Sequence, residues 1–70
     1  MNRDDLIDKY KEMFNQANAD FATALREKYK YKRAGDFEEA QLYESETYVH
    51  SNVMHMCEEI IEDLQNMERV

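Results

Sequence analysis

The chain lacks proline and tryptophan, and it has a single glycine and a single cysteine among its 70 residues. This composition leaves no proline-rich linker and no low-complexity tract. One glycine cannot build a loop that cradles phosphate groups, so nucleotide-binding loops of that kind are excluded. One cysteine cannot form an intramolecular disulfide, and no Cys/His spacing typical of a structural zinc site occurs.

Long apolar runs are also absent. The first residues, Met-Asn-Arg-Asp-Asp, lead directly into charged sequence, and no stretch approaches the ~18 consecutive apolar residues of a membrane-spanning helix. We therefore expect no signal peptide and no membrane contact, and we expect a cytoplasmic protein. The lone thiol and the five methionines fit a reducing compartment.

The chain does contain enough apolar sequence to fold. Hydrophobic residues make up 43% of it and charged residues 36%, with a net charge of −7. We predict one domain over residues 1–70, and a core of that size rarely supplies more than ~3–5 kcal/mol unaided. Since disulfides and structural metals are excluded, association with another chain is the remaining common way to stabilise it.

Core-type residues recur at alternating steps of three and four in two stretches, a spacing typical of helices packed along a seam. The first stretch contains Ile7, Tyr10, Phe14, Ala17, Phe21, Ala24, Lys28 and Tyr31. The second contains Ala40, Tyr43, Thr47, His50, Met54, Cys57, Ile61 and Leu64. These positions, here called the seam, predict an all-α antiparallel two-helix hairpin with helices over about residues 3–34 and 37–68.

Capping residues support those boundaries. Asn2 is the predicted N-cap of the first helix, and Gly35 follows its end because glycine adopts the left-handed conformation without a Cβ penalty. Asp36 and Glu39 form the D-x-x-E variant of a capping box for the second helix. A loop this short turns the second helix back along the first, with arms of roughly 45 Å.

Antiparallel pairing about Gly35 predicts which seam residues meet. Toward the open end, where the chain starts and finishes, Phe14 faces Cys57. Toward the turn, Lys28 faces Tyr43 and Tyr31 faces Ala40, so the turn end is thinner and more polar.

The segment Gly-Asp-Phe-Glu-Glu-Ala at residues 35–40, together with Tyr43, resembles the turn and second-helix start of a tetratricopeptide repeat. The resemblance implies a helix-turn-helix at this place. The first helix is much longer than that family's, no second copy of the motif exists, and the closing proline is missing. The family's peptide-binding function is therefore not transferred to this chain.

The apolar stripe widens near the open end, beyond what the seam of a hairpin can bury. The residues that flank the seam there are Leu6, Met13, Val53, Ile60 and Met67. They form the edge of the hairpin's own core, the interface with a second copy, or the interface with a different protein. We predict the second copy, which gives a homodimeric four-helix bundle.

Basic residues alternate with tyrosines just before the turn. This basic segment contains Arg26, Lys28, Tyr29, Lys30, Lys32 and Arg33. Cations mixed with aromatic rings can bind single-stranded nucleic acid. Cations in the last turns of a helix also stabilise its negative dipole end, and Asp36, Glu38 and Glu39 can neutralise them across the turn.

Acidic residues gather at the open end, where they oppose stability. The members of this acidic cluster are Asp4, Asp8, Glu58, Glu59, Glu62 and Asp63. Glu58 with Glu62 and Glu59 with Asp63 are like-charge pairs near a helix C-terminus, which already disfavours negative charge. The cluster is either a solvated face or a docking surface for a basic partner.

The sequence gives little support for a catalytic site or a metal site. His50, Met54 and Cys57 share the seam, but the neighbouring His55 and Met56 point elsewhere, so packing explains the run better than a metal site. A slender hairpin offers no deep pocket in which carboxylate pKa values could be pushed apart. We expect no enzymatic activity, no cofactor and no small-molecule substrate.

The function predicted from the sequence is that of a small acidic protein-binding regulator, an inhibitor or adaptor, that acts stoichiometrically through a helical-hairpin dimer. The alternative is a nucleic-acid-binding accessory protein that uses the basic segment.

Overall fold

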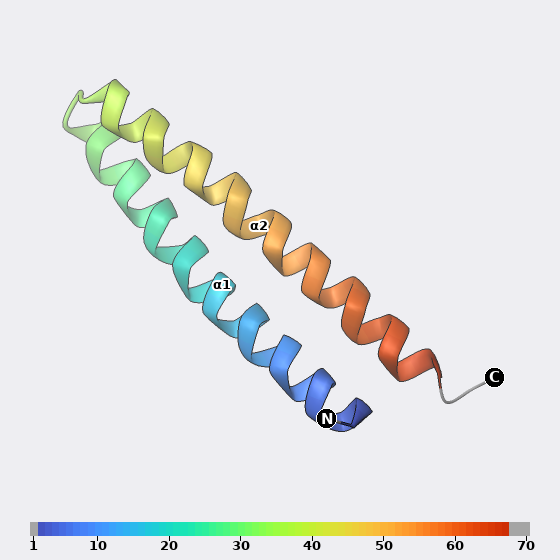
Figure 1. The fold of residues 1–70 in the computed structure, drawn as a ribbon. Helices are drawn as coiled ribbons and strands as arrows, with labels where there is room; N and C mark the ends of the chain where they lie inside the picture. The colour runs from blue at the N-terminus through green and yellow to red at the C-terminus, as the bar shows by residue number, and fades with distance from the viewer. Residues whose placement is uncertain (1, 68–70) are drawn as a thin grey trace.

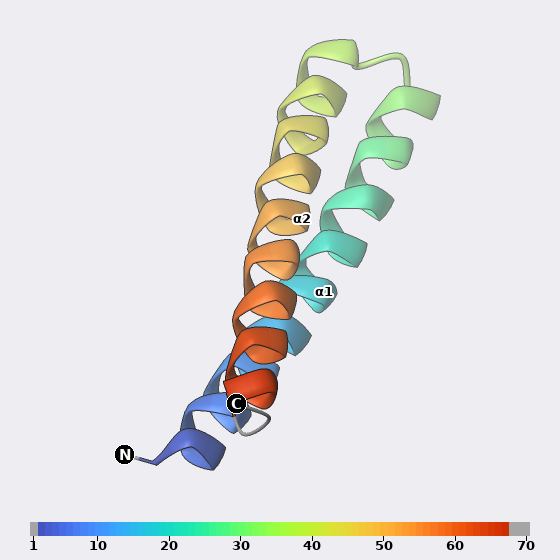
Figure 2. The same ribbon diagram turned by 90° about the vertical axis from the view of Figure 1, so that its right-hand side faces the viewer.

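The computed structural model describes residues 2–67 and contains two long helices. Helix α1 spans Arg3–Arg33 and helix α2 spans Phe37–Asn66. They lie side by side and antiparallel, joined by a short turn at one end (Figures 1 and 2). The predicted all-α helical hairpin is confirmed. Helix α1 ends one residue earlier than expected, α2 ends with Met67 as its C-cap, and residue 68 of the predicted range lies outside the described residues.

The start of α1 is fixed by the predicted cap. The side chain of Asn2 accepts a hydrogen bond from the backbone N–H of Asp5 at 2.8 Å, and the Asp5 carboxylate accepts one from the N–H of Asn2 at 3.5 Å. This reciprocal capping box satisfies amides that have no partner within the helix.

Gly35 and Asp36 both have their predicted roles in the turn. Gly35 has φ +80°, and the N–H groups of Gly35 and Asp36 donate to the carbonyls of Lys32 and Tyr31 at 3.2 and 2.9 Å. This is a Schellman arrangement, which closes α1 and reverses the chain. The Asp36 carboxylate then accepts from the N–H of Glu39 at 3.3 Å, so the Asp36 half of the predicted capping box is present.

The predicted seam forms the core of the hairpin. Every position of both registers is buried or half-buried. The most buried side chains are small, with Ala24 and Cys57 each 2% exposed and Ala17 5% exposed. Small residues at these points let the two backbones approach closely. Thr47 is the buried polar residue of the seam, and its hydroxyl donates to the carbonyl of Glu44.

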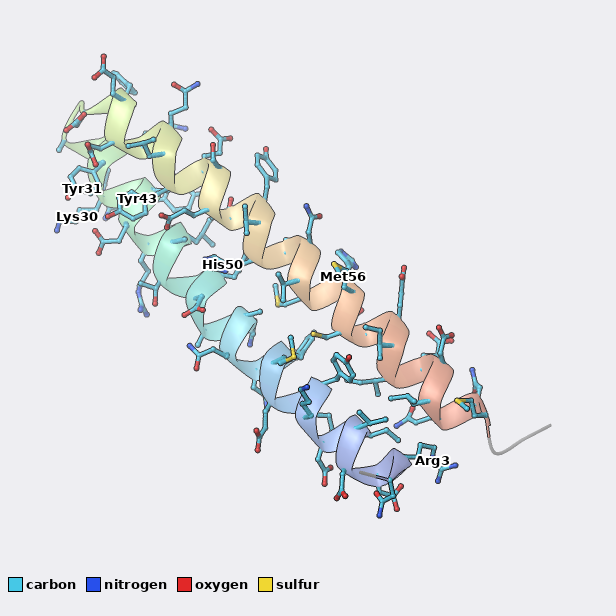
Figure 3. The ribbon with its side chains drawn as sticks, in the orientation of Figure 1. Arg3, Lys30, Tyr31, Tyr43, His50 and Met56 are labelled. Carbon is cyan, nitrogen blue, oxygen red and sulfur yellow. The ribbon has the colours of Figure 1, made fainter. Side chains whose placement is uncertain are left out.

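Near the turn the contacts differ from the predicted pairs. The rings of Tyr31 and Tyr43 stack with centroids 5.6 Å apart and planes 5° apart (Figure 3). Lys28 pairs with Glu44 at 3.7 Å. Helical side chains lean toward the N-terminus of their own helix. In antiparallel helices Tyr31 therefore leans away from the turn and Tyr43 toward it, which brings the two rings to one level.

The hairpin is a thin rod with much exposed surface. It measures 54 × 16 × 13 Å, and its radius of gyration is 16.0 Å, against about 11 Å for a compact chain of this length. It exposes 5465 Å², about 800 Å² more than a compact monomer of 8.5 kDa. Over residues 2–67, neither helix combines the length and hydropathy needed to cross a membrane.

Candidate functional site

One face of the hairpin carries the apolar residues that flank the seam. Met13 is 42% exposed and Met67 66% exposed, while Leu6, Val53 and Ile60 are half-buried. A shallow groove between the helices has an almost wholly apolar surface and includes Met13 from α1 and Val53 from α2. The structure therefore brings members of the predicted strip together from both helices.

The sequence analysis missed part of this face. Leu42, Val49 and Met56 are 61%, 58% and 60% exposed, and Figure 3 shows Met56 on the outer side of α2. Together with predicted members they form a second 3-4 series along α2. That series is Leu42, Glu46, Val49, Val53, Met56, Ile60, Asp63 and Met67. The same spacing rule that identified the seam identifies these residues.

Helix geometry explains why both helices contribute to one face. On each helix the flanking residues directly precede seam positions, for example Met13 before Phe14 and Val53 before Met54. One residue is a rotation of about 100°. Because the helices run in opposite directions, the same offset turns both series toward the same side of the hairpin. We call Leu6, Met13 and the apolar members of the α2 series the extended strip.

The acidic cluster lies at the open end. Asp4 pairs with Arg3 at 3.5 Å, and Asp8 lines a hollow that also contains Arg3 and Lys11. The α2 members of the cluster are exposed and make no ion pair within residues 2–67, and the last turn of α2 contains no basic residue. Those α2 members are Glu58, Glu59, Glu62 and Asp63.

An open groove beside this cluster combines apolar and acidic side chains. Phe14 and Ile61 are among its apolar lining residues, and Glu58, Glu62 and Lys11 are among its charged ones. Its volume is about 540 Å³, and it opens widely to solvent. Such a groove suits a side chain with an apolar stem and a positive head better than it suits a small molecule, which needs enclosure.

The basic segment is largely engaged within the hairpin. Lys28 reaches Glu44 at 3.7 Å, and Lys30 reaches Glu27 at 3.9 Å. The ammonium groups of Lys28 and Lys30 also lie 5.4 and 5.5 Å from the ring centroids of Tyr29 and Tyr31. The Arg26 guanidinium donates to the hydroxyl of Thr23 at 3.3 Å.

The basic residues also do not share a face. Lys28 and Lys32 line one hollow with Phe37, whereas Arg26, Lys30 and Arg33 follow each other at steps of four and three on another side of α1. Tyr29 remains 46% exposed.

The side chains of the histidine-methionine-cysteine run do not meet at one point, as the ligands of a metal ion would. His50 lies between the helices in Figure 3, and Cys57 is buried in the seam, while His55 and Met56 are exposed. Among residues 2–67, no three His, Cys, Asp or Glu side chains come together in a way that could hold a metal ion.

No protein-family model matches this chain. No curated protein matches it, and no solved structure does. The description of the seam, the extended strip and the two charged ends therefore rests on the sequence and the structure of this chain alone.

Proposed function

We propose that the chain is a small acidic protein-binding regulator, an inhibitor or adaptor, that acts stoichiometrically as a homodimeric four-helix bundle. The observation that carries the proposal is the extended strip, an apolar series on one face of a hairpin whose own seam is already filled; on α2 the strip is unbroken from Val49 to Ile60. Soluble monomers rarely expose such a patch. A second copy covers it with an identical face, which a two-fold axis allows.

The surface area of the hairpin fits this proposal. The excess of about 800 Å² over a compact monomer matches the area that each partner buries in an interface of standard size.

The α2 carboxylates at the open end support docking to a basic protein. They repel one another, and no cation within residues 2–67 pairs with them. Placed against a positively charged surface, they would speed association and select the partner by charge. The contacts of Lys28, Lys30 and Tyr31 within the hairpin favour this partner over nucleic acid, because those groups are already in use.

Neighbouring residues provide a matched test of the dimer. Val49 belongs to the extended strip and Tyr48 does not, yet they are similarly exposed, at 58% and 64%. We expect Val49→Lys to weaken dimerisation by about tenfold or more, ~1.4 kcal/mol, and Tyr48→Lys to leave it unchanged. Sedimentation equilibrium should give twice the mass of 8.5 kDa for the wild type. A wild-type chain that sediments as a monomer at all concentrations would refute the dimer.

A capture experiment tests the docking surface. The tagged protein is incubated with nuclease-treated and untreated extract, and the retained proteins are identified by mass spectrometry. We expect a stoichiometric protein that survives nuclease and is lost when Glu58, Glu59, Glu62 and Asp63 are changed to lysine. Neutralising Lys28, Lys30 and Lys32 to glutamine is the control, and it should have no effect.

The nucleic-acid alternative makes the opposite predictions for the same variants. Retention would then depend on the three lysines, disappear with nuclease, and fall steeply and log-linearly with salt.

A further inference from the structure

We infer that the two copies pair antiparallel, with α2 packed against α2 and the two-fold axis passing between Val53 and Met56. The inference rests on the proposed dimer and adds its orientation and its register. The open end of each copy then lies beside the turn of the other.

The α2 series reads the same in both directions. From Leu42 to Met67 it runs apolar, acidic, four times apolar, acidic, apolar. Its midpoint falls between Val53 and Met56. An antiparallel second copy centred there places Leu42 opposite Met67 and Val49 opposite Ile60, so every apolar residue of the series meets an apolar residue, while the two acidic residues, Glu46 and Asp63, lie opposite each other at the outer positions. Such self-complementarity is what a two-fold interface requires.

Two polar pairs of α1 on the same face agree with this register, while the apolar Leu6 and Met13 lie opposite Lys30 and Thr23 of the second copy. Ala17 lines the same groove as Val53, so the axis crosses α1 near residues 17 and 18. Reversal about that level places Lys9 opposite Glu27 of the second copy. It also places Gln16 opposite Asp20 of the second copy, whereas in the single hairpin Gln16 donates to its own Asp20 at 3.0 Å.

A parallel dimer would concentrate negative charge at one level. Glu27 and Glu46 both lie near Tyr43, so they share a level near the turn. Parallel pairing would gather both residues from both copies there, which makes four carboxylates in one layer. Antiparallel pairing divides them between two layers, each of which also contains Lys9 and Asp63 of the other copy, so the net charge of each layer is −2 and not −4. Since Coulomb repulsion grows with the product of the charges, the divided arrangement costs less.

The net charges of the two ends favour the same orientation. With the axis near residues 17 and 18 of α1, Asp4 comes to the level of Lys32 of the second copy, and Asp8 to the level of Lys28, although these residues line hollows on the side away from the extended strip and do not meet across the interface. In a parallel dimer the acidic open end would instead lie at the level of another acidic open end.

Distances between spin labels distinguish the two orientations. Cys57 is replaced by alanine and Glu38, which is exposed near the turn, by cysteine; the labelled chain is then measured by double electron-electron resonance. An antiparallel dimer places the two labels nearly the length of the rod apart, close to 54 Å. A parallel dimer places both at one end, at a fraction of that distance, and this result would overturn the inference.

A second label separates failure of the orientation from failure of the dimer. In the Cys57→Ala background, a label at His55→Cys lies near the middle of the rod and gives a short distance in either orientation. A short distance at His55 with a short distance at Glu38 refutes only the antiparallel pairing. No intermolecular distance at either site refutes the dimer itself.

Cross-linking of the unmodified chain does not depend on those variants folding. Lys9 and Glu27 are 18 positions apart on one helix, or about 27 Å, beyond the reach of a zero-length carbodiimide cross-link. We expect a Lys9–Glu27 cross-link between isotopically light and heavy copies in a mixed sample. A dimer that cross-links elsewhere between copies but never at this pair would overturn the register.

Discussion

The fold changes the titration of Tyr43. Its ring stacks on Tyr31 near the turn (Figure 3). Partial burial raises the pKa of the Tyr43 phenol from its usual 10.0, and the neighbouring Tyr31 and Glu27 raise it further. The folded hairpin therefore favours the neutral phenol.

This raised pKa predicts a loss of stability at alkaline pH. The contribution of Tyr43 is fully present below the unfolded pKa of about 10 and is lost as the pH rises from there through the folded value, because the unfolded chain releases its proton first. We expect urea midpoints to fall above about pH 10, and Tyr43→Phe to reduce that fall. Tyr48→Phe, at an exposed tyrosine, is the control. Equal falls in all three proteins would contradict the prediction.

At the scale of the elements, the left-handed glycine of the turn determines how α1 ends. A Cβ at Gly35 would meet no atom within 4 Å, so a substitution there is opposed only by the backbone conformation at φ +80°. We expect Gly35→Ala to lower the free energy of unfolding by about 1–2 kcal/mol. Gly35→Asn should cost less, because asparagine tolerates this conformation. Urea denaturation measures both, and an alanine variant as stable as the wild type would be inconsistent with the turn described.

Close approach of the helices depends on the small seam residues. Ala24 is 2% exposed, so a leucine there must push the helices apart. We expect Ala24→Leu to lower the free energy of unfolding by about 1–3 kcal/mol. Ala22 is exposed on the same helix, and Ala22→Leu should change stability by less than about 0.5 kcal/mol. Thermal or urea melts that rank the two variants in the opposite order would show that Ala24 is not a tight contact.

The elements were predictable because their signals are local. The seam periodicity, the Asn2 cap, Gly35 and Asp36 each act within a few residues, and the structure shows all four. The Tyr31–Tyr43 stack was not predicted, because pairing by backbone level ignores the direction in which long side chains lean.

The candidate sites were predictable only in part. The extended strip was underestimated at Leu42, Val49 and Met56, although their spacing is visible in the sequence. The dimer interface and the acidic docking surface stay predictions. The residues of one chain determine the polarity and charge of a face, but the molecule that covers that face belongs to a second chain.

At the scale of the whole molecule, a hairpin that is stabilised by its partner should melt in a concentration-dependent way. Association with a second folded copy adds stability by mass action, so Tm should rise as the protein concentration rises. We expect this dependence in the wild type and in Tyr48→Lys, and a weaker dependence in Val49→Lys. Circular dichroism melts over a hundredfold range of concentration measure it, and an unchanging wild-type Tm would argue against the dimer.

The short turn also has a kinetic consequence. Contacts near Gly35, such as Tyr31 with Tyr43, close a loop of about a dozen residues, whereas contacts at the open end close nearly the whole chain and cost more entropy when formed alone. The hairpin should therefore zip from the turn outward and fray from the other end, with the fastest backbone hydrogen exchange near the start of α1 and the end of α2. The carboxylates proposed to meet a partner would then be carried on the part of the rod that forms last and opens first.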